Sequence, residues 1–265
     1  MYSAPQLTAK YIRYYLTASS GKGHGIHSPF VYDFVIKVLG NKRRFDSYIG
    51  IETGRRRLLK DNRLLPVADY GAGSVTGYRQ YRSVASITRN AVKSRKTGQL
   101  LFRIANYYKP VSMIELGTSM GLSSAYLALG NPLGRLVSLE GAPAIAALAK
   151  ENFVSWGIRN ISITEGNFDH TLEPLLQTLH GIDLAFIDGN HRQIPTLRYF
   201  QQLLQKCKRP AILIFDDIHW SRDMESAWQL IKDHPAVLLT IDLFFMGLVF
   251  LNDDFKVKQH FVIRF

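Results

Sequence analysis

The sequence has few of the features that mark a secreted or membrane protein. It contains one cysteine, Cys207, so no disulfide can form within the chain, and no Cys/His spacing resembles a structural zinc site. The first twenty residues lack the continuous apolar stretch of a signal peptide. The most apolar late segment, 236–251, is interrupted by Thr240 and Asp242 well short of a membrane span. We therefore expect a cytoplasmic protein with no membrane partner.

Acidic residues are scarce in the first part of the chain. Residues 1–110 hold 20 Lys and Arg against 5 Asp and Glu, a balance of +15, whereas residues 111–265 hold 13 against 16, a balance of −3. The whole net charge of +12 therefore originates in the first part. Such a segment can attract nucleic acid, an anionic small molecule or a membrane surface, and it can equally be a solvated helical face. We expect a basic, mainly helical N-terminal cap over 1–98 and a second domain over 99–265.

The second part of the chain has the pattern of an α/β fold. Short apolar or β-branched runs alternate with longer helical stretches, which predicts a doubly wound, mostly parallel, seven-stranded sheet. The predicted strands are Val111–Leu116, Arg135–Leu139, Asn160–Thr164, Asp183–Ile187, Ala211–Phe215, Ala236–Leu243 and Phe245–Leu251, with Phe261–Phe265 as a candidate edge strand. A helix is expected from about His191 to Lys206, and Cys207 is expected to continue it. Amphipathic patterns predict earlier helices at Leu7–Leu16, Pro29–Leu39 and Gln99–Tyr108.

An acidic residue stands at the end of each of the first five predicted strands. Ligands of open parallel sheets bind at the carboxyl ends of the strands, so function is expected there. These acids are Glu115, Glu140, Glu165, Asp188 and the pair Asp216-Asp217. Any one of them could merely cap a helix. Five in succession indicate a binding site.

A glycine loop follows the first of these strands. Gly117-Thr118-Ser119-Met120-Gly121 would let the backbone approach a ligand at a helix N-terminus, and its spacing departs from the dinucleotide pattern Gly-x-Gly-x-x-Gly. Glu115 would repel a pyrophosphate and attract the ammonium and sulfonium groups of S-adenosylmethionine. Glu140, 25 residues further on, is suited to accept ribose hydroxyls of either ligand type. The charge of Glu115 therefore favours S-adenosylmethionine over a nicotinamide dinucleotide.

The segment Ile114–Ser123 resembles the first motif of class I S-adenosylmethionine-dependent methyltransferases, in the branch of the catechol and caffeoyl-CoA O-methyltransferases. The resemblance covers about residues 100–251. It implies a Rossmann-like methyltransferase domain over 99–265 that transfers a methyl group to an oxygen, or less readily a nitrogen, of a small molecule. The basic first part of the chain makes an anionic acceptor one option. The resemblance also implies a set of residues that contact the cofactor: Glu115, Gly117, Thr118, Ser119, Gly121, Glu140, Gly141, Gly166, Asn167, Phe168 and Asp188.

Two further groups are candidates for chemistry at the acceptor. Asp188 and His191 resemble the segment in which this branch carries an acid and then a basic residue; that residue is usually lysine, so His191 is a departure. Histidine can take a hydroxyl proton at neutral pH, and it is also a common structural residue at a helix start. Asp188, Asp216 and Asp217 offer oxygen ligands of the kind that Mg²⁺ or Ca²⁺ prefers, or cap the next helix. His219 is expected to be structural.

Alternatives remain open at this point. Arg55-Arg56-Arg57 and Lys93-Ser94-Arg95-Lys96 keep RNA methylation as a rival function. A protein that binds S-adenosylmethionine without turnover is another, because a fold does not guarantee chemistry. The segment Ala68–Ser74 looks like a second cofactor loop, but Pro66 interrupts the run before it and no strand ending in an acid follows, so we expect a flexible connection. The oligomeric state cannot be predicted.

Overall fold

The computed structural model describes residues 1–67 and 80–265, so the segment Ala68–Ser74 lies outside the described residues. Contacts divide the chain into two compact units. We call residues 42–178 the continuous unit and residues 1–41 with 179–265 the segmented unit. Neither unit ends between residues 98 and 99, so the division into a cap and a methyltransferase domain stays a prediction.

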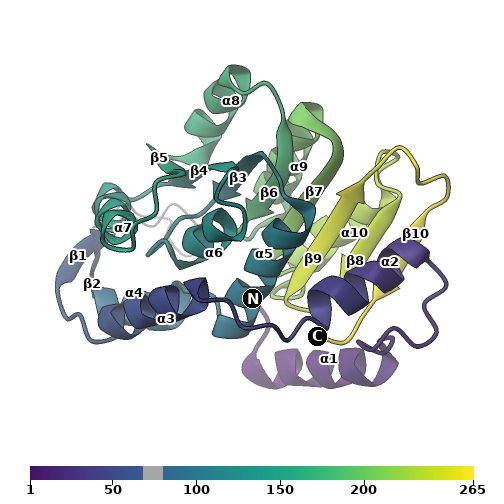
Figure 1. The fold of residues 1–265 in the computed structure, drawn as a ribbon. Helices are drawn as coiled ribbons and strands as arrows, with labels where there is room; N and C mark the ends of the chain where they lie inside the picture. The colour runs from purple at the N-terminus through teal and green to yellow at the C-terminus, as the bar shows by residue number, and fades with distance from the viewer. Residues whose placement is uncertain (68–79) are drawn as a thin grey trace. The chain divides into compact units, whose positions relative to one another are not determined.

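The continuous unit contains three parallel strands with helices between them (Figure 1). Along the chain these are β3 (Ser112–Leu116), α6 (Leu122–Gly130), β4 (Arg135–Glu140), α7 (Pro143–Ser155), β5 (Ile161–Glu165) and α8 (Phe168–Thr178). β3 pairs with β4 and β4 with β5. The predicted strands are confirmed to within one residue at each end. Pro143 opens α7, where its missing N–H costs no hydrogen bond.

The first part of the continuous unit is more ordered than the sequence predicted. It contains α3 (Ser47–Leu58), the antiparallel pair β1 (Leu64–Val67) and β2 (Gln80–Ser83), α4 (Val84–Ala91) and α5 (Arg95–Tyr108). Only α5 was predicted. The pattern of α3 is obscured by Gly54, which is buried because the Trp156 ring packs against it; a Cβ there would lie 2.5 Å from the ring. Pro66, read as a break, lies inside β1 in a two-stranded pair, where a proline is tolerated.

The segmented unit joins the start of the chain to its last third. It contains α1 (Ala4–Thr17), α2 (Pro29–Phe34), the π-helix η1 (Val35–Leu39), β6 (Ile182–Ile187), α9 (Gln193–Lys206), β7 (Cys207–Asp216), α10 (Arg222–Asp233), β8 (Leu239–Asp242), β9 (Met246–Leu251) and β10 (Gln259–Val262). β6 and β7 are parallel, and β9 is antiparallel to both β7 and β8. Cys207 begins β7, so its predicted place in a helix was wrong.

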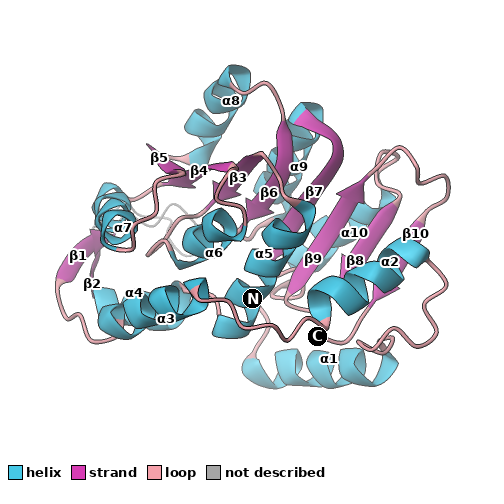
Figure 2. Cartoon of the chain, in the orientation of Figure 1, coloured by secondary structure: helices cyan, strands magenta, loops and turns pink. Residues whose placement is uncertain are grey.

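The hydrogen-bonded strand order of the main sheet is β10-β8-β9-β7-β6-β3-β4-β5. The candidate edge strand near the C-terminus is real, since β10 pairs in parallel with β8, and the sheet therefore has eight strands where seven were predicted. Figure 2 shows the strands with helices beside them. The parallel pairings β10–β8, β3–β4, β4–β5 and β6–β7 confirm the mostly parallel α/β fold class. Within the described ranges, no helix is both long and apolar enough to cross a bilayer.

Candidate functional site

The loop between β3 and α6 has the backbone that its glycines predicted. Gly117, Ser119 and Gly121 have φ angles of 104°, 48° and 81°, in the left-handed region that glycine adopts without strain. A Cβ on Gly121 would lie 2.5 Å from the Phe153 ring of α7, so only glycine fits. The N–H groups of Gly117 and Thr118 both donate to the Leu139 carbonyl of β4, at 3.0 and 3.2 Å. The loop is thus fixed against the end of the neighbouring strand.

Glu115 lies within β3 and has no solvent exposure. Its carboxylate accepts hydrogen bonds from the hydroxyls of Ser124 on α6 and Ser138 on β4, the latter at 2.6 Å. The Thr118 hydroxyl bonds Ser138 at 2.6 Å and extends this buried network into the loop. Glu115 therefore connects β3, β4 and α6 in this structure, and its direct contact with a cationic ligand stays a prediction.

Glu140, the last residue of β4, holds the glycine loop from the other side. Its Oε2 accepts the Ser119 N–H at 2.9 Å and its Oε1 accepts the Ala142 N–H at 3.0 Å. Burial raises the pKa of this carboxyl, although backbone hydrogen bonds from Ala142, Ser119 and Gly141 oppose the shift. Each carboxylate oxygen has two lone pairs, so Glu140 can still accept hydrogen bonds from a ligand.

The turn after β5 completes the predicted cofactor residues. Gly166, with φ of 127°, donates its N–H to the Glu140 carbonyl at 2.9 Å, which joins this turn to the end of β4. Asn167 caps α8: its side-chain oxygen accepts the Asp169 N–H and its carbonyl accepts the His170 N–H, both at 2.9 Å. Phe168 is half-buried at the first position of α8. The three strand ends of the continuous unit are thus bonded to one another.

In the segmented unit, strand register brings two of the predicted acids together. β6 and β7 pair with Ile187 opposite Phe215, so the next residues, Asp188 and Asp216, occupy equivalent positions at the carboxyl ends of adjacent parallel strands. Asp216 is 2% exposed, and the Asp188 side chain is 12% exposed. Two carboxylates held this close repel each other unless a cation or a proton lies between them.

His191 joins this pair because of the turn before it. Asn190 has a φ of 52°, a left-handed conformation that asparagine tolerates, and its side chain donates to the Tyr199 hydroxyl of α9 at 3.2 Å. This turn places His191 Nε2 3.6 Å from Asp188 Oδ1. His191 precedes α9, which begins at Gln193, and was not expected in the metal-ligand set. The atoms of Asp188, His191 and Asp216 that could bind a metal lie within 4.8 Å of one another.

Asp217, the third predicted metal ligand, is not part of that cluster. It has a φ of 54°, and its N–H donates to the Phe245 carbonyl at 2.7 Å. Its carboxylate Oδ2 lies 4.0 Å from His191 Nε2. The turn therefore places Asp217 beside the cluster of Asp188, His191 and Asp216.

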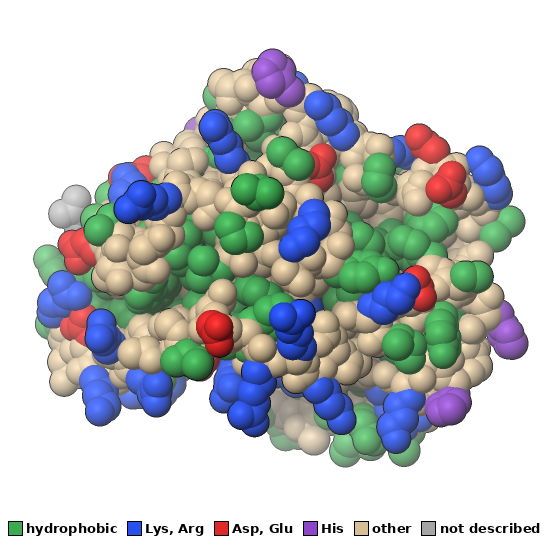
Figure 3. Space-filling model, in the orientation of Figure 1, with side chains coloured by type: hydrophobic (Ala, Val, Ile, Leu, Met, Phe, Trp, Pro, Cys, Tyr) green, Lys and Arg blue, Asp and Glu red, His purple; other side chains and the backbone are tan. Residues whose placement is uncertain are grey.

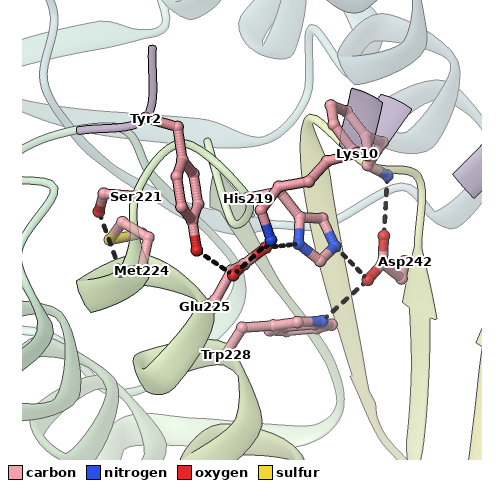
Figure 4. A network of polar contacts seen from close by, with 9 residues as sticks. Tyr2, Lys10, His219, Ser221, Met224, Glu225, Trp228 and Asp242 are labelled. Atoms are coloured by element: carbon pink, nitrogen blue, oxygen red, sulfur yellow. Dashed lines mark hydrogen bonds and ion pairs between the residues drawn. The ribbon is translucent and has the colours of Figure 1, made fainter. Parts of the chain in front are cut away.

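His219 anchors the loop after β7 to the N-terminal helix (Figure 4). Its Nδ1 bonds Glu225 at 3.0 Å and its Nε2 bonds Asp242 at 2.8 Å. Burial lowers the pKa of His219, but its hydrogen bonds to Asp242 and Glu225 outweigh burial and raise the pKa overall. Lys10 of α1 bonds both Glu225 oxygens at 2.9 and 3.0 Å, and Tyr2 donates to Glu225 at 2.6 Å. The expected structural role fits this network.

The structure assembles the predicted residues in two groups, one in each unit. The group of the continuous unit offers a glycine cradle, backbone donors and a buried acid, which suits a nucleoside bearing a polar tail. The group of the segmented unit offers two carboxylates and an imidazole, which suits a cation or a hydroxyl proton. Sequence reasoning missed Ser124, Ser138, Asn190 and the tether to Lys10; of these, only the αL preference of Asn190 had a local signal.

Comparison with known proteins finds similarity to methyltransferases. A family described as a methyltransferase domain matches residues 114–218. A catechol O-methyltransferase of Mycobacterium tuberculosis is 30% identical over 138 residues, which cover 51% of this chain and 60% of that enzyme. A catechol O-methyltransferase of Niastella koreensis is 29% identical over 167 residues, which cover 59% of this chain and 74% of that enzyme.

A solved structure supports the fold over the whole length. The methyltransferase PaMTH1 of Podospora anserina, crystallised with S-adenosylhomocysteine, matches with a TM-score of 0.58 at 16% identity, covering 96% of this chain and 99% of that one. The glycine loop, Glu140 and the acids after β6 and β7 all lie within or at the end of the matched domain. Residues 114–218 therefore match a methyltransferase domain, and the chain, which spans 60% of the length of the Mycobacterium tuberculosis relative, is similar to catechol O-methyltransferases.

Proposed function

We propose that this protein transfers the methyl group of S-adenosylmethionine to a hydroxyl oxygen of a small molecule. The observation that carries the proposal is the Glu140 carboxylate, which fixes the glycine loop through the Ser119 N–H and retains lone pairs for two ribose hydroxyls. The Ser119 hydroxyl is buried and finds no hydrogen-bond partner among the described residues, which leaves a polar group for the ligand. Relatives named catechol O-methyltransferase support oxygen as the acceptor atom.

In this reaction the acceptor oxygen attacks the methyl carbon as the bond from carbon to sulfur breaks, and S-adenosylhomocysteine leaves. The loop and Glu140 hold the nucleoside end, and Gly166, Asn167 and Phe168 border its base. Alignment of two bound reactants supplies most of the rate, because it replaces a bimolecular encounter. The acceptor's proton passes to His191 or a neighbouring acid. A divalent ion, when bound at Asp188 and Asp216, would lower the pKa of the acceptor hydroxyl.

We further propose that the basic first 98 residues favour an acceptor that carries negative charge. The described part of this segment contributes ten exposed basic side chains from the continuous unit: Lys42, Arg43, Arg44, Arg56, Arg57, Lys60, Arg63, Arg89, Arg95 and Lys96. Such a surface raises the local concentration of anions. Nucleic acid is the alternative anionic partner, and its test is given in the Discussion.

The test is an assay of S-adenosylhomocysteine formation with catechol and with a carboxylated catechol, with and without divalent metal. We expect turnover with both acceptors and a lower KM for the charged one. Calorimetric titration with S-adenosylmethionine and with a nicotinamide dinucleotide accompanies the assay, and only the former should bind. Binding without turnover of any acceptor would favour the non-catalytic alternative, and binding of the dinucleotide alone would overturn the assignment.

A further inference from the structure

The spacing of His191 relative to Asp188 matches two ligands of one ion better than a hydrogen bond. The distance of 3.6 Å between His191 Nε2 and Asp188 Oδ1 exceeds the usual hydrogen-bond range of about 2.7–3.2 Å. Two atoms that each lie about 2.1 Å from the same ion are separated by about 3.0–4.2 Å, depending on the angle between them. The separations within the cluster, all within 4.8 Å, need only a small closure to reach that range.

The donor set is chemically mixed. Mg²⁺ and Ca²⁺ prefer oxygen ligands throughout, whereas an imidazole nitrogen together with carboxylates suits Zn²⁺, Fe²⁺ or Co²⁺. We propose that His191 is a metal ligand, with Asp188 and Asp216, and that this site selects a first-row transition ion over Mg²⁺ and Ca²⁺. The role of the metal in catalysis rests on the proposed function, whereas the binding of the metal can be measured without it.

The position of His191 is enforced by the surrounding backbone. Asn190 holds the left-handed turn through its bond to the buried Tyr199, so the imidazole is oriented before any ion binds. Asp217, 4.0 Å from the same nitrogen, adds negative charge beside a bound cation without belonging to the ligand cluster. A preoriented nitrogen and two carboxylates lower the cost of ordering the site.

Coordination and proton transfer compete for the same nitrogen. When His191 Nε2 binds an ion, its lone pair is unavailable to take the acceptor's proton, so the base in the metal-bound protein is another group. The predicted catalytic role of His191 and its role as a ligand are therefore alternatives that experiment can separate.

The experiment measures metal binding directly. The full chain, stripped with a chelator, is titrated calorimetrically with Zn²⁺, Co²⁺ and Mg²⁺, and the Co²⁺ form is examined for the visible absorption that reports nitrogen coordination. In His191→Gln an amide oxygen replaces the nitrogen, so affinity for Co²⁺ and Zn²⁺ should fall at least tenfold while affinity for Mg²⁺ stays the same or rises. Asp217→Asn keeps all three proposed ligands, so it should lower the affinities for Co²⁺ and Zn²⁺ less than His191→Gln does and should lower the affinity for Mg²⁺ in the same proportion.

Two controls distinguish the loss of a metal ligand from the removal of any histidine and from misfolding. His27→Gln removes an exposed histidine far along the chain from the cluster and should leave all affinities unchanged. Circular dichroism and S-adenosylhomocysteine binding confirm that each variant is folded. The proposal is overturned if the native chain binds no transition ion, if it binds Mg²⁺ as tightly as Co²⁺, or if His191→Gln binds Co²⁺ like the native chain. If no methyl transfer is observed, the proposed function is wrong, but the titrations still decide whether His191 binds a metal ion.

Discussion

At the scale of single residues, Gly121 shows how one missing Cβ shapes the cofactor loop. Gly121→Ala should destabilise the protein by about 2 kcal/mol or more, because alanine pays about 1–2 kcal/mol for a left-handed φ and its Cβ also overlaps the Phe153 ring. S-adenosylhomocysteine binding should weaken as the loop shifts. Urea denaturation and calorimetry provide the two measurements.

Gly157 is the matched control for that substitution. It also has a positive φ, 69°, but a Cβ there meets nothing within 4 Å. Gly157→Ala should therefore cost only the backbone term, about 1 kcal/mol, and leave ligand affinity intact. Equal losses in the two variants would show that contact with Phe153 plays no part.

Glu140 predicts a pH dependence of cofactor binding. A carboxylate accepts hydrogen bonds from ribose hydroxyls well, and a protonated carboxyl accepts them poorly. Burial raises the pKa of Glu140. As the pH is lowered, the affinity for S-adenosylhomocysteine should therefore begin to fall at a higher pH than it would with a glutamate of ordinary pKa. Above that raised pKa Glu140 is ionised, and the affinity for S-adenosylhomocysteine is at its maximum. Glu140→Gln should bind S-adenosylhomocysteine about tenfold more weakly, with a flat pH profile.

The control for this experiment is Glu165→Gln. Glu165 also ends a strand, but its side chain is 40% exposed and paired with Lys150. Its substitution should leave both the affinity and the pH profile unchanged. A pH profile that persists in Glu140→Gln would assign the titration to another group.

These residues also mark what the sequence could reveal. The loop glycines and Glu140 were predictable because their conformations and spacing are local. The complete burial of Glu115 was not, since Ser124 and Ser138 reach it from a helix and a neighbouring strand. Likewise, Asp188 lies beside Asp216 only because of the register of β6 and β7, and His191 reaches Asp188 because of the turn at Asn190.

At the scale of elements, α1 is held by the pairing of Lys10 with Glu225. Glu225→Gln weakens the bonds to Lys10, Tyr2 and His219 together, and we expect a loss of about 1–2 kcal/mol in the free energy of unfolding. Lys10→Met should lose under 1 kcal/mol, because the pair is partly exposed. A double-mutant cycle in urea measures the coupling.

The pair Lys37–Asp33 is the control for that cycle. It has a comparable contact distance, 2.6 Å, but both side chains are about half exposed. Lys37→Met should change stability by no more than a few tenths of a kcal/mol. A coupling near zero between Lys10 and Glu225 would show that this ion pair does not help to hold α1, which would then depend on other contacts such as those of Tyr11 and Tyr14 with Phe244.

The start of β7 makes a prediction about Cys207. Burial raises the pKa of its thiol to about 12, so almost no thiolate exists at pH 8. A thiol reagent should modify the folded chain far more slowly than the same chain in urea, where the pKa returns to about 8.5. Rapid modification of the folded protein would contradict this raised pKa.

Elements differed in how well their sequence predicted them. β3, β4 and β6 to β9 followed from apolar runs, which buried strands require. β5 is a partly exposed edge strand, and its β-branched residues predicted it. α3 escaped prediction because Gly50 and Gly54 weaken its helical pattern, and its stability depends on packing by Trp156 from a distant part of the chain. β1 and β2 escaped because short two-stranded pairs have little pattern of their own.

At the scale of the whole molecule, the basic excess predicts salt-sensitive binding of polyanions. Figure 3 shows Lys and Arg side chains gathered over α3 and α4, where Arg56, Arg57, Lys60 and Arg89 are exposed. A filter-binding assay with RNA should show retention at low salt that is lost at physiological salt, because counterion release drives such binding. No retention at low salt would end the RNA alternative; tight retention at high salt would favour it.

The order of the segments along the chain has a consequence for synthesis on the ribosome. Residues 42–178 form one uninterrupted unit, which can collapse as soon as they emerge, while residues 1–41 must wait for partners that are translated last, such as Glu225 and Phe244. Until then Tyr11 and Tyr14 are exposed to other chains. Residues 1–41 are therefore the segment most vulnerable to misassembly during synthesis.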